Sequence, residues 1–364
     1  LKDPKVAGQM NIASFNLRQL MKAMMMEVPS TADPKALTRV SMKTDFSGGK
    51  KALKMKNIRL KLDDSSVKGD FDVVGFENPA TSFNLAIDGI NADRYLEPQK
   101  KGEKPKPITP GTAVASAAEQ LPVDTMRKLK INGNLAIGKL TVAGAKLNNV
   151  QLSLNAKDGK INLSPAQANL YKGSYFGKAR IDATGNQPAL YLTSSIKNMN
   201  AGPLLEDLNI QSNIEGIMNS DLTIRSTGSS TEAIKKNLSG DAKFTFTDGT
   251  LKGVNFGRLV REVDAAINGK KLPPDTEPLE TDFSEMSGSF KIANGLVSNQ
   301  DLIMKSPLVR VEGKGKAHLV SENIDYSIVA SVVKSSKGQG GEQLSKLEGI
   351  PIPVKVTGTF SKPK

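Results

Sequence analysis

The sequence predicts a mainly β protein: a long antiparallel meandering sheet with short capped helices between batches of about five strands. Three observations predict this class. Apolar and polar residues alternate along most of the chain, Asp-Gly and Asn-Gly pairs separate several alternating runs, and a seven-residue pattern built around an asparagine recurs four times. Such alternation is typical of strands with one dry and one wet face, as antiparallel sheets have.

Alternation is clearest in residues 83–87, 149–155, 242–246 and 324–328. Side chains two apart on a strand share a face, so each run presents its apolar residues to one side. We expect the following apolar residues to line one continuous interior: Leu85, Ile87, Leu152, Leu154, Ile161, Leu163, Phe244, Phe246, Ile324 and Ile328. This mixture of side chains suits a packed sandwich core and a groove for acyl chains equally, so both alternatives stay open.

Turn residues divide the runs into hairpins. Asp158-Gly159, Asp248-Gly249 and Asn294-Gly295 supply the positive φ that tight hairpins require. Two batches of strands follow from these breaks. The expected strands are 130–142, 145–157, 159–170, 173–184 and 187–197 in one batch, and 283–293, 295–305, 307–319, 322–333 and 351–360 in the other.

The recurring pattern is an apolar residue, an asparagine, three variable residues and two apolar residues. Asparagine is a preferred N-cap, and the apolar residues before and after it can form a hydrophobic staple. The pattern therefore predicts helices that begin at Asn16, Asn91, Asn200 and Asn255. The clearest helix covers 256–267, and a second, methionine-rich helix is expected over 16–27, where methionine is more often core filler than a partner-binding surface.

Composition excludes several classes of function. The chain has 364 residues, no Cys, one His and a net charge of +13. Without Cys there are no disulfides, thiol nucleophiles or Cys-ligated metals, and no phosphate loop, zinc spacing or nucleophile elbow is present. We therefore expect no enzyme, no metal and no cofactor. The basic residues are spread out except at 50–61 and 100–106, which favours a solvated face over nucleic-acid binding, with anionic lipid head groups as the sharper alternative.

No stretch reaches the roughly 18–20 apolar residues of a membrane-spanning helix, and the chain starts inside a patterned segment. We expect a fragment from which an N-terminal targeting or anchoring portion is missing. Loops rich in Pro, Lys, Gly or Ser are expected at 97–111, 268–281 and 334–341. The expected organisation is a β module with an N-terminal amphipathic helix at 1–96, a Lys/Pro-rich linker or loop at 97–126, a second β module at 127–208, strands with a crossover helix at 209–268, and a C-terminal β module at 269–364.

Four passages, taken in order, resemble the AsmA family of bacterial envelope proteins. The first is 87–96, which ends in Arg94-Tyr95-Leu96, and the second is 146–205. The third is 246–255, and the last is 352–360. The resemblance covers nearly the whole chain.

The resemblance implies a protein of the periplasm, tethered to the inner membrane by an N-terminal anchor that has no counterpart here, and acting in outer-membrane biogenesis. Larger members look like repeating β-groove, taco-like bridges for lipid transfer. Resemblance thus implies phospholipid transfer between inner and outer membrane, with acyl chains in the groove and membranes at both ends of the intact protein as partners. The alternative is a non-enzymatic structural or interaction protein that modulates outer-membrane protein assembly through its sheet edges or basic loops.

Overall fold

A computed structural model describes most of the chain in detail. The described residues are 5–98, 120–210, 213–269, 271, 278–307, 309–333, 351–360 and 362–364. The expected loop at 334–341 and the basic segment 100–106 lie outside them, as do most of 97–111 and part of 268–281. The chain divides into two units: unit 1 is Leu1–Tyr191 with Asp207–Asn209, and unit 2 is Leu192–Glu206 with Ile210–Lys364.

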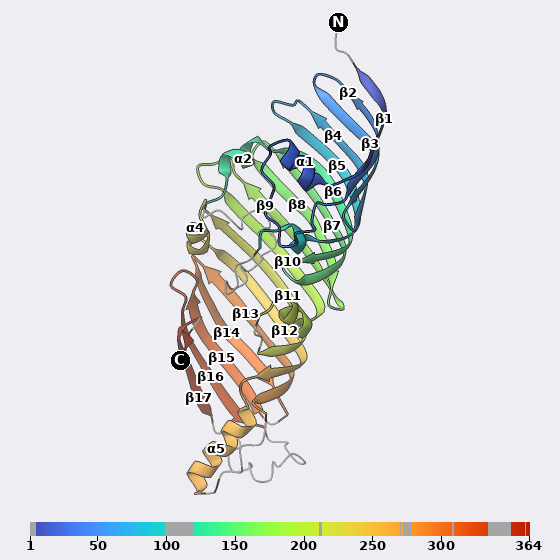
Figure 1. Cartoon of the computed structure of the whole chain (residues 1–364). Coiled ribbons are helices and arrows are strands. Elements are labelled where there is room, and N and C mark those ends of the chain that lie inside the picture. Colours follow the sequence, from blue (N-terminus) through green and yellow to red (C-terminus); the bar gives the residue numbers. More distant parts are fainter. Residues whose placement is uncertain are drawn as a thin grey trace. The chain divides into compact units, whose positions relative to one another are not determined.

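In the described part of unit 1, nine complete strands pair in chain order (Figure 1). They are β1 (Val6–Phe15), β2 (Val40–Gly48), β3 (Ala52–Leu62), β4 (Ser65–Val74), β5 (Ala80–Asn91), β6 (Lys130–Val142), β7 (Ala145–Lys157), β8 (Lys160–Leu170) and β9 (Gly173–Asp182). Three short helices accompany them: α1 (Leu17–Ala23), the 3-10 helix η1 (Ala92–Tyr95) and α2 (Val123–Lys128).

Unit 2 contains most of β10 and the remaining strands. They are β10 (Ala189–Asn200), β11 (Ile214–Thr227), β12 (Ser239–Lys252), β13 (Glu280–Ala293), β14 (Leu296–Lys305), β15 (Val309–His318), β16 (Asn323–Val332), β17 (Ile352–Thr359) and the short β18 (Lys362–Pro363). The helices are α3 (Ala201–Asp207), whose last residue groups with unit 1, α4 (Thr231–Lys236) and α5 (Phe256–Asn268). From β11 to β18 each strand pairs antiparallel with the next.

The predicted fold class is confirmed: the protein is mainly β, with a mostly antiparallel open sheet and short helices between batches of strands. The expected strand at 145–157 matches β7 residue for residue, and most others end within two or three residues of the prediction. The strands β5 and β6 differ from the predicted antiparallel arrangement, since they run parallel. Parallel neighbours need a crossover of a dozen or more residues, and residues 92–129 connect these two strands.

The prediction of a hairpin turn at Asp248-Gly249 is wrong. Asp158-Gly159 and Asn294-Gly295 do connect consecutive strands, with positive φ at both residues of each pair. Asp248 also has a positive φ of 50°, but it lies inside β12, where the pairing with β11 shifts by one residue. The pair therefore forms a β-bulge, which uses the same backbone conformation as a tight turn without reversing the chain.

Bulges recur in other strands. Asn57 in β3 and Asn149 in β7 have φ of 56° and 50°, and the register shifts beside each of them. The extra residue leaves an amide that the neighbouring strand cannot pair. At Asn57 this amide donates to the Asp70 carboxylate at 3.0 Å, so the bulge is stabilised by a side chain of the adjacent strand.

Asparagines stand at the starts of α1, η1, α3 and α5. The Oδ1 atoms of Asn16, Asn91 and Asn255 accept hydrogen bonds from first-turn amides of α1, η1 and α5, at 3.0, 3.1 and 2.8 Å. Asn200 directly precedes α3. The helix expected over 16–27 is shorter than predicted and ends at Ala23, because Met25 adopts a left-handed φ of 56°. No residue of α1 is buried and the Met25 side chain is 97% exposed, so these methionines are not core filler.

We expect Asn255→Ala to lower the free energy of unfolding by about 1 kcal/mol, because the first turn of α5 loses its acceptor. Asn255→Asp is the matched control, since aspartate keeps the cap but loses the bond from Nδ2 to the Pro278 carbonyl. Urea unfolding measures both variants. Equal losses in the two would assign the stabilisation to the Pro278 bond instead of the cap.

Candidate functional site

One face of unit 1 carries three uninterrupted rows of cross-strand partners. Directly opposed residues on paired strands share a face, so each row runs across the strands on one side of the sheet. Row 1 is Ile12, Met42, Leu60, Val67, Ile87, Ile137 and Val150. Row 2 is Ile58, Gly69, Leu85, Leu135, Leu152, Ala166 and Gly177. Row 3 is Gly8, Phe46, Met55, Phe71, Phe83, Gly133, Leu154, Leu163 and Ala179. None of these residues carries a charge or a hydrogen-bonding side chain.

Glycines in row 3 make room for aromatic rings. A Cβ added at Gly133 would lie 2.3 Å from the ring of Phe83, which is far inside van der Waals contact. Phe83 therefore lies flat across the next strand instead of projecting from it. Because Gly133 has no side chain, the Phe83 ring occupies the space above it and row 3 continues across β6.

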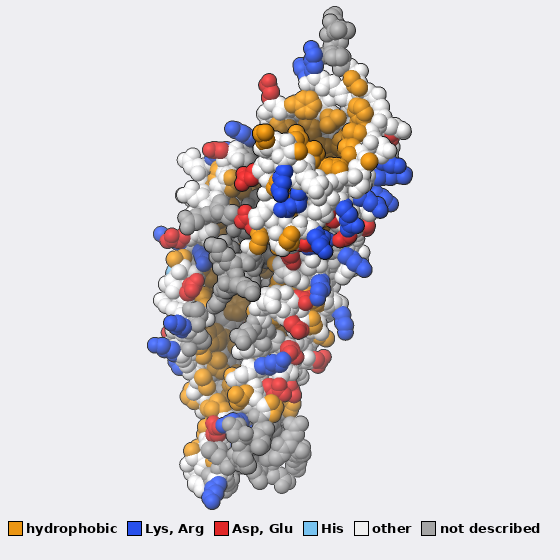
Figure 2. All heavy atoms as spheres, viewed as in Figure 1, with side chains coloured by type: hydrophobic (Ala, Val, Ile, Leu, Met, Phe, Trp, Pro, Cys, Tyr) orange, Lys and Arg blue, Asp and Glu red, His pale blue; other side chains and the backbone are white. Residues whose placement is uncertain are grey.

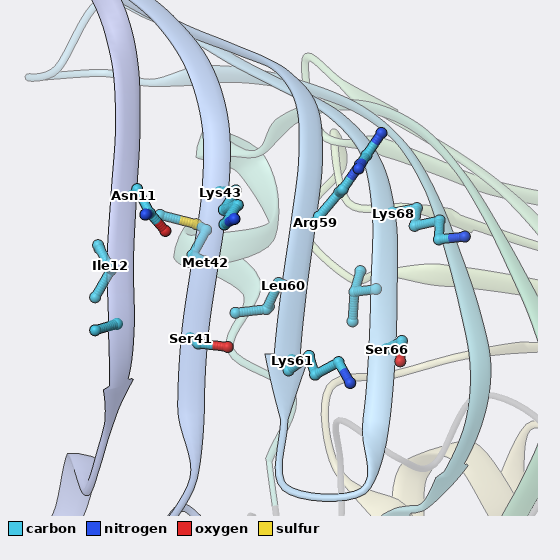
Figure 3. Close-up of a pocket in the computed structure, with 12 residues that line it drawn as sticks. Asn11, Ile12, Ser41, Met42, Lys43, Arg59, Leu60, Lys61, Ser66 and Lys68 are labelled. Atoms are coloured by element: carbon cyan, nitrogen blue, oxygen red, sulfur yellow. The ribbon is translucent and has the colours of Figure 1, made fainter.

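The part of the apolar face that β1 to β4 form contains a hollow. A cavity of about 360 Å³ lies against these strands, and row 1 residues Ile12, Met42, Leu60 and Val67 line it. Figure 3 shows Met42 and Leu60 pointing to one side of the sheet and Arg59 and Lys68 to the other. Figure 2 shows hydrophobic side chains gathered in a hollow over this part of unit 1. The lining also includes Lys43, Arg59, Lys61 and Lys68, of which Arg59 and Lys68 point away from Met42 and Leu60.

Unit 2 repeats the arrangement. One row runs through Met218, Phe246, Met286, Met304, Val311, Ala330 and Ile352. A second row runs through Ile224, Gly240, Ile292, Val297, Ala317, Ile324 and Gly358. Phe244 lies between them and stacks on Phe290 with ring centroids 5.5 Å apart.

Helix α5 covers part of this second face. Its Phe256 and Val260 are buried in a cluster that includes Phe246, Phe283 and Met304 of the sheet. Leu259 and Val263 pack against the same cluster. At this end of unit 2 the apolar face is therefore a closed core. In unit 1, row 1 borders the cavity on β1 to β4, whereas Ile137 and Val150 of the same row are buried in a cluster with Ala168.

The ten residues predicted to share an interior fall on these faces. Leu85 and Leu152 belong to row 2, Ile87 to row 1, and Leu154 and Leu163 to row 3. The other members are Ile161, two residues from Leu163 on β8, and Phe244, Phe246, Ile324 and Ile328 in unit 2. Phe246 is buried, the other nine are half-buried, and none is exposed.

The sequence-based prediction of the apolar face did not include residues of β2 to β4, among them the aromatic side chains Phe46 and Phe71 of row 3. The bulge at Asn57 explains part of the omission. Met55 and Leu60 are five residues apart, which places them on opposite faces of a regular strand, but the extra residue brings both to the same face. The signal for this bulge in the sequence was Asn57, an asparagine inside an otherwise alternating run.

One network of charged side chains lies at the strand ends, away from the rows. The Asp63 carboxylate, in the β3–β4 turn, accepts hydrogen bonds from the amides of Leu37, Thr38 and Arg39 at 2.8–3.0 Å and from the Tyr95 hydroxyl at 2.9 Å. Next to it, Arg94 donates to Asp33 at 2.7 Å and to Asp64 at 2.8 Å. These contacts fix the segment before β2 and helix η1 to one end of the strands.

The network shifts the ionisation of its members. Burial raises the pKa of Asp63, but the three amides and the Tyr95 hydroxyl together outweigh it and hold that pKa below its ordinary value. Burial, with the hydrogen bond to Asp63, raises the pKa of Tyr95 to about 12. Arg94 and Tyr95 of the passage 87–96 thus have a structural role. They clamp the crossover to the β3–β4 turn.

The fold and the apolar faces define a class: an open β-sheet protein with repeated batches of strands and continuous apolar rows. A profile of the AsmA family matches residues 5–302, and the chain belongs to this family of bacterial envelope proteins. Within the described residues there is no helix long and apolar enough to cross a membrane. Nor does that part of the chain hold a group of three or more His, Cys, Asp or Glu residues placed to bind a metal ion.

Two proteins of Escherichia coli (strain K12) are similar to the chain. Protein AsmA is 19% identical over 336 residues, which cover 88% of this chain and 54% of that protein. AsmA family protein YhjG is 24% identical over 281 residues, which cover 73% of this chain and 36% of that protein. The chain therefore spans about half the length of protein AsmA and a smaller share of YhjG. No solved structure matches it.

The two faces predict different responses to a buried charge. Phe246→Asp should lower the free energy of unfolding by about 3–5 kcal/mol, because it puts a charge into the closed core under α5. Leu154→Asp should cost about 1 kcal/mol, since its half-buried position on the open face lets water reach the carboxylate. Urea unfolding compares them, and equal destabilisation would mean that the face of unit 1 is also a closed core.

The Asp63 network predicts acid sensitivity. Because the folded-state pKa of Asp63 is lowered, its contribution is fully present above the unfolded-state value near 4 and is lost as pH falls through the folded-state value. Asp63→Asn should cost about 1–3 kcal/mol at pH 7, since an amide cannot accept from all these donors. The difference between variant and wild type should shrink towards pH 3 in urea titrations. A difference independent of pH would contradict this account.

Proposed function

We propose that the chain is part of a bridge-like lipid transfer protein that moves phospholipid between the inner and outer membranes. The observation that carries this proposal is the set of uncharged rows across unit 1, of which row 1 borders an open cavity on β1 to β4. Rows that run across the strands give an acyl chain a path in which every step meets another apolar side chain. Head groups would stay in water at the open side.

The hydrophobic effect favours an occupant for this face. Apolar surface in contact with water costs about 25 cal/mol per Å², and each buried methylene gains about 0.8 kcal/mol. Along β5, rows 1 and 3 are four residues apart, at Ile87 and Phe83, so the apolar strip is about 13 Å wide. Movement along such a strip needs no catalytic group, because an acyl chain that leaves one apolar side chain meets a similar one on the next strand.

The proposal includes a setting. The protein would act in the periplasm, tethered to the inner membrane, and would support outer-membrane biogenesis. Its partners would be phospholipid acyl chains in the groove and the membranes at both ends of the intact protein. Membership of an envelope protein family supports this setting. A non-enzymatic role in outer-membrane protein assembly is the competing function.

A photo-crosslinking pair on β7 tests the proposal. Benzoylphenylalanine at Leu152, in row 2, should capture phospholipid when the chain is produced in the bacterial periplasm, and mass spectrometry should show the adduct. The same probe at the adjacent Gln151, which is exposed and points to the opposite face, should give no lipid adduct. Organic extracts of the purified chain should also contain phospholipid. Absence of lipid at both positions and in the extract would favour the assembly role.

A further inference from the structure

Three neighbouring strand ends in unit 1 form a tip, defined here as Val6, Lys50, Lys51, Val74 and Phe76. The start of β1 lies beside the β2–β3 turn, because Val6 is paired with Gly48. The β2–β3 turn lies beside the β4–β5 turn, since the Gly75 amide donates to the Lys51 carbonyl at 2.7 Å. Backbone pairing therefore holds these three strand ends side by side.

Apolar side chains of the tip are exposed. Val6 is 60% exposed, Val74 is 51% exposed and Phe76 is 54% exposed. Single exposed apolar residues are ordinary, but a group on adjacent turns is typical of an interaction surface. Phe76 adds a large ring at the end of a hairpin.

Cations accompany these side chains. Lys5, Lys50 and Lys51 are exposed on the same strand ends, and Glu77 is the acidic residue beside them. An apolar group that can enter the acyl boundary, flanked by lysines that reach phosphates, matches the chemistry of an anionic bilayer surface. A purely acidic polypeptide would pair with the lysines but would offer no apolar layer to Phe76 and the two valines.

Other strand ends of unit 1 differ from the tip. Because β5 and β6 are parallel, the β7–β8 turn lies at the same edge of the sheet, yet it consists of Asp158 and Gly159 between two exposed lysines. The opposite edge carries the Asp63 and Arg94 network. The tip thus differs from these two sites in combining exposed apolar side chains with cations.

We propose that this tip docks on a lipid bilayer containing anionic phospholipid, with Val74 and Phe76 in the interfacial layer and Lys50 and Lys51 at the phosphates. Row 3 is the apolar row closest to the tip, since Phe71 precedes Val74 by three residues on β4. A docked bilayer would therefore adjoin the apolar face. The inference rests on the proposed function for its purpose, but membrane docking is measurable without any lipid transfer.

The chain has no tryptophan, so a single introduced one reports on its own surroundings. Phe76→Trp should show a blue-shifted emission on addition of vesicles of phosphatidylglycerol and phosphatidylethanolamine, and no shift with phosphatidylcholine vesicles. Phe176→Trp is the matched control, because Phe176 is 42% exposed in the same unit but lies on β9, away from the tip. Its emission should not change.

Vesicle co-sedimentation measures the contribution of each part. Lys50→Ala with Lys51→Ala, and separately Val74→Ser with Phe76→Ser, should each weaken binding to the anionic vesicles about tenfold or more. Lys157→Ala with Lys160→Ala, which removes the lysines flanking the Asp158-Gly159 turn, should bind as the wild type. Circular dichroism checks that every variant is folded.

The proposal is overturned if the tip variants bind like the wild type, or if the control lysine pair loses as much binding as the tip pair. Binding to an acidic polypeptide but not to vesicles would also overturn it. The two proposals fail separately. Lipid adducts at Leu152 without vesicle binding would remove the docking surface alone, and vesicle binding without lipid adducts would remove lipid transfer alone.

Discussion

Cross-strand register is the constraint on which the rest of this structure depends. The apolar rows exist only because each strand presents its apolar residues directly opposite those of the next, from Gly8 on β1 to Ala179 on β9. A slip of one residue anywhere would turn a strand's apolar side chains to the wet face. The bulges protect this register. At Asn57, the extra residue keeps Met55 and Leu60 on one face, and the Asp70 carboxylate satisfies the amide that the bulge leaves over.

The same apolar pattern serves two purposes along the chain. In unit 2, α5 lies on the row that includes Phe246 and Met304, and Phe256 and Val260 turn that end of the face into a core. In unit 1, row 1 borders a cavity on β1 to β4, Ile137 and Val150 of that row are buried farther along, and most other residues of the rows are half-buried. The closure at α5 comes from the covering helix and not from the strands, whose side chains are of the same kind. A protein that has to be stable and still keep an apolar surface available can divide these two demands between its parts.

Several polar contacts lie where strands end. Asp63 collects three backbone amides and a tyrosine hydroxyl, and Asp93 of η1 accepts from the amides of Ala143 and Gly144 in the β6–β7 turn. The Tyr171 hydroxyl donates to Asp207 at 2.6 Å, which fixes the end of α3 to the β8–β9 turn. These contacts attach helices and crossovers to the edges of the sheet. Because they lie at the edges, no buried charge interrupts the apolar rows.

Local sequence determined the strands, most turns and the starts of the helices, because alternation, Asp-Gly or Asn-Gly pairs and capping asparagines act over a few residues. Residues 145–157 and Asn255 are examples in which neighbours along the chain suffice. Tertiary structure decided three other features. Asp248-Gly249 became a bulge because β11 continues beside it, and β5 and β6 became parallel because a long crossover separates them. The tertiary structure also decided where α5 closes the apolar face of unit 2. The packing of α5 is a long-range contact that no local sequence pattern contains.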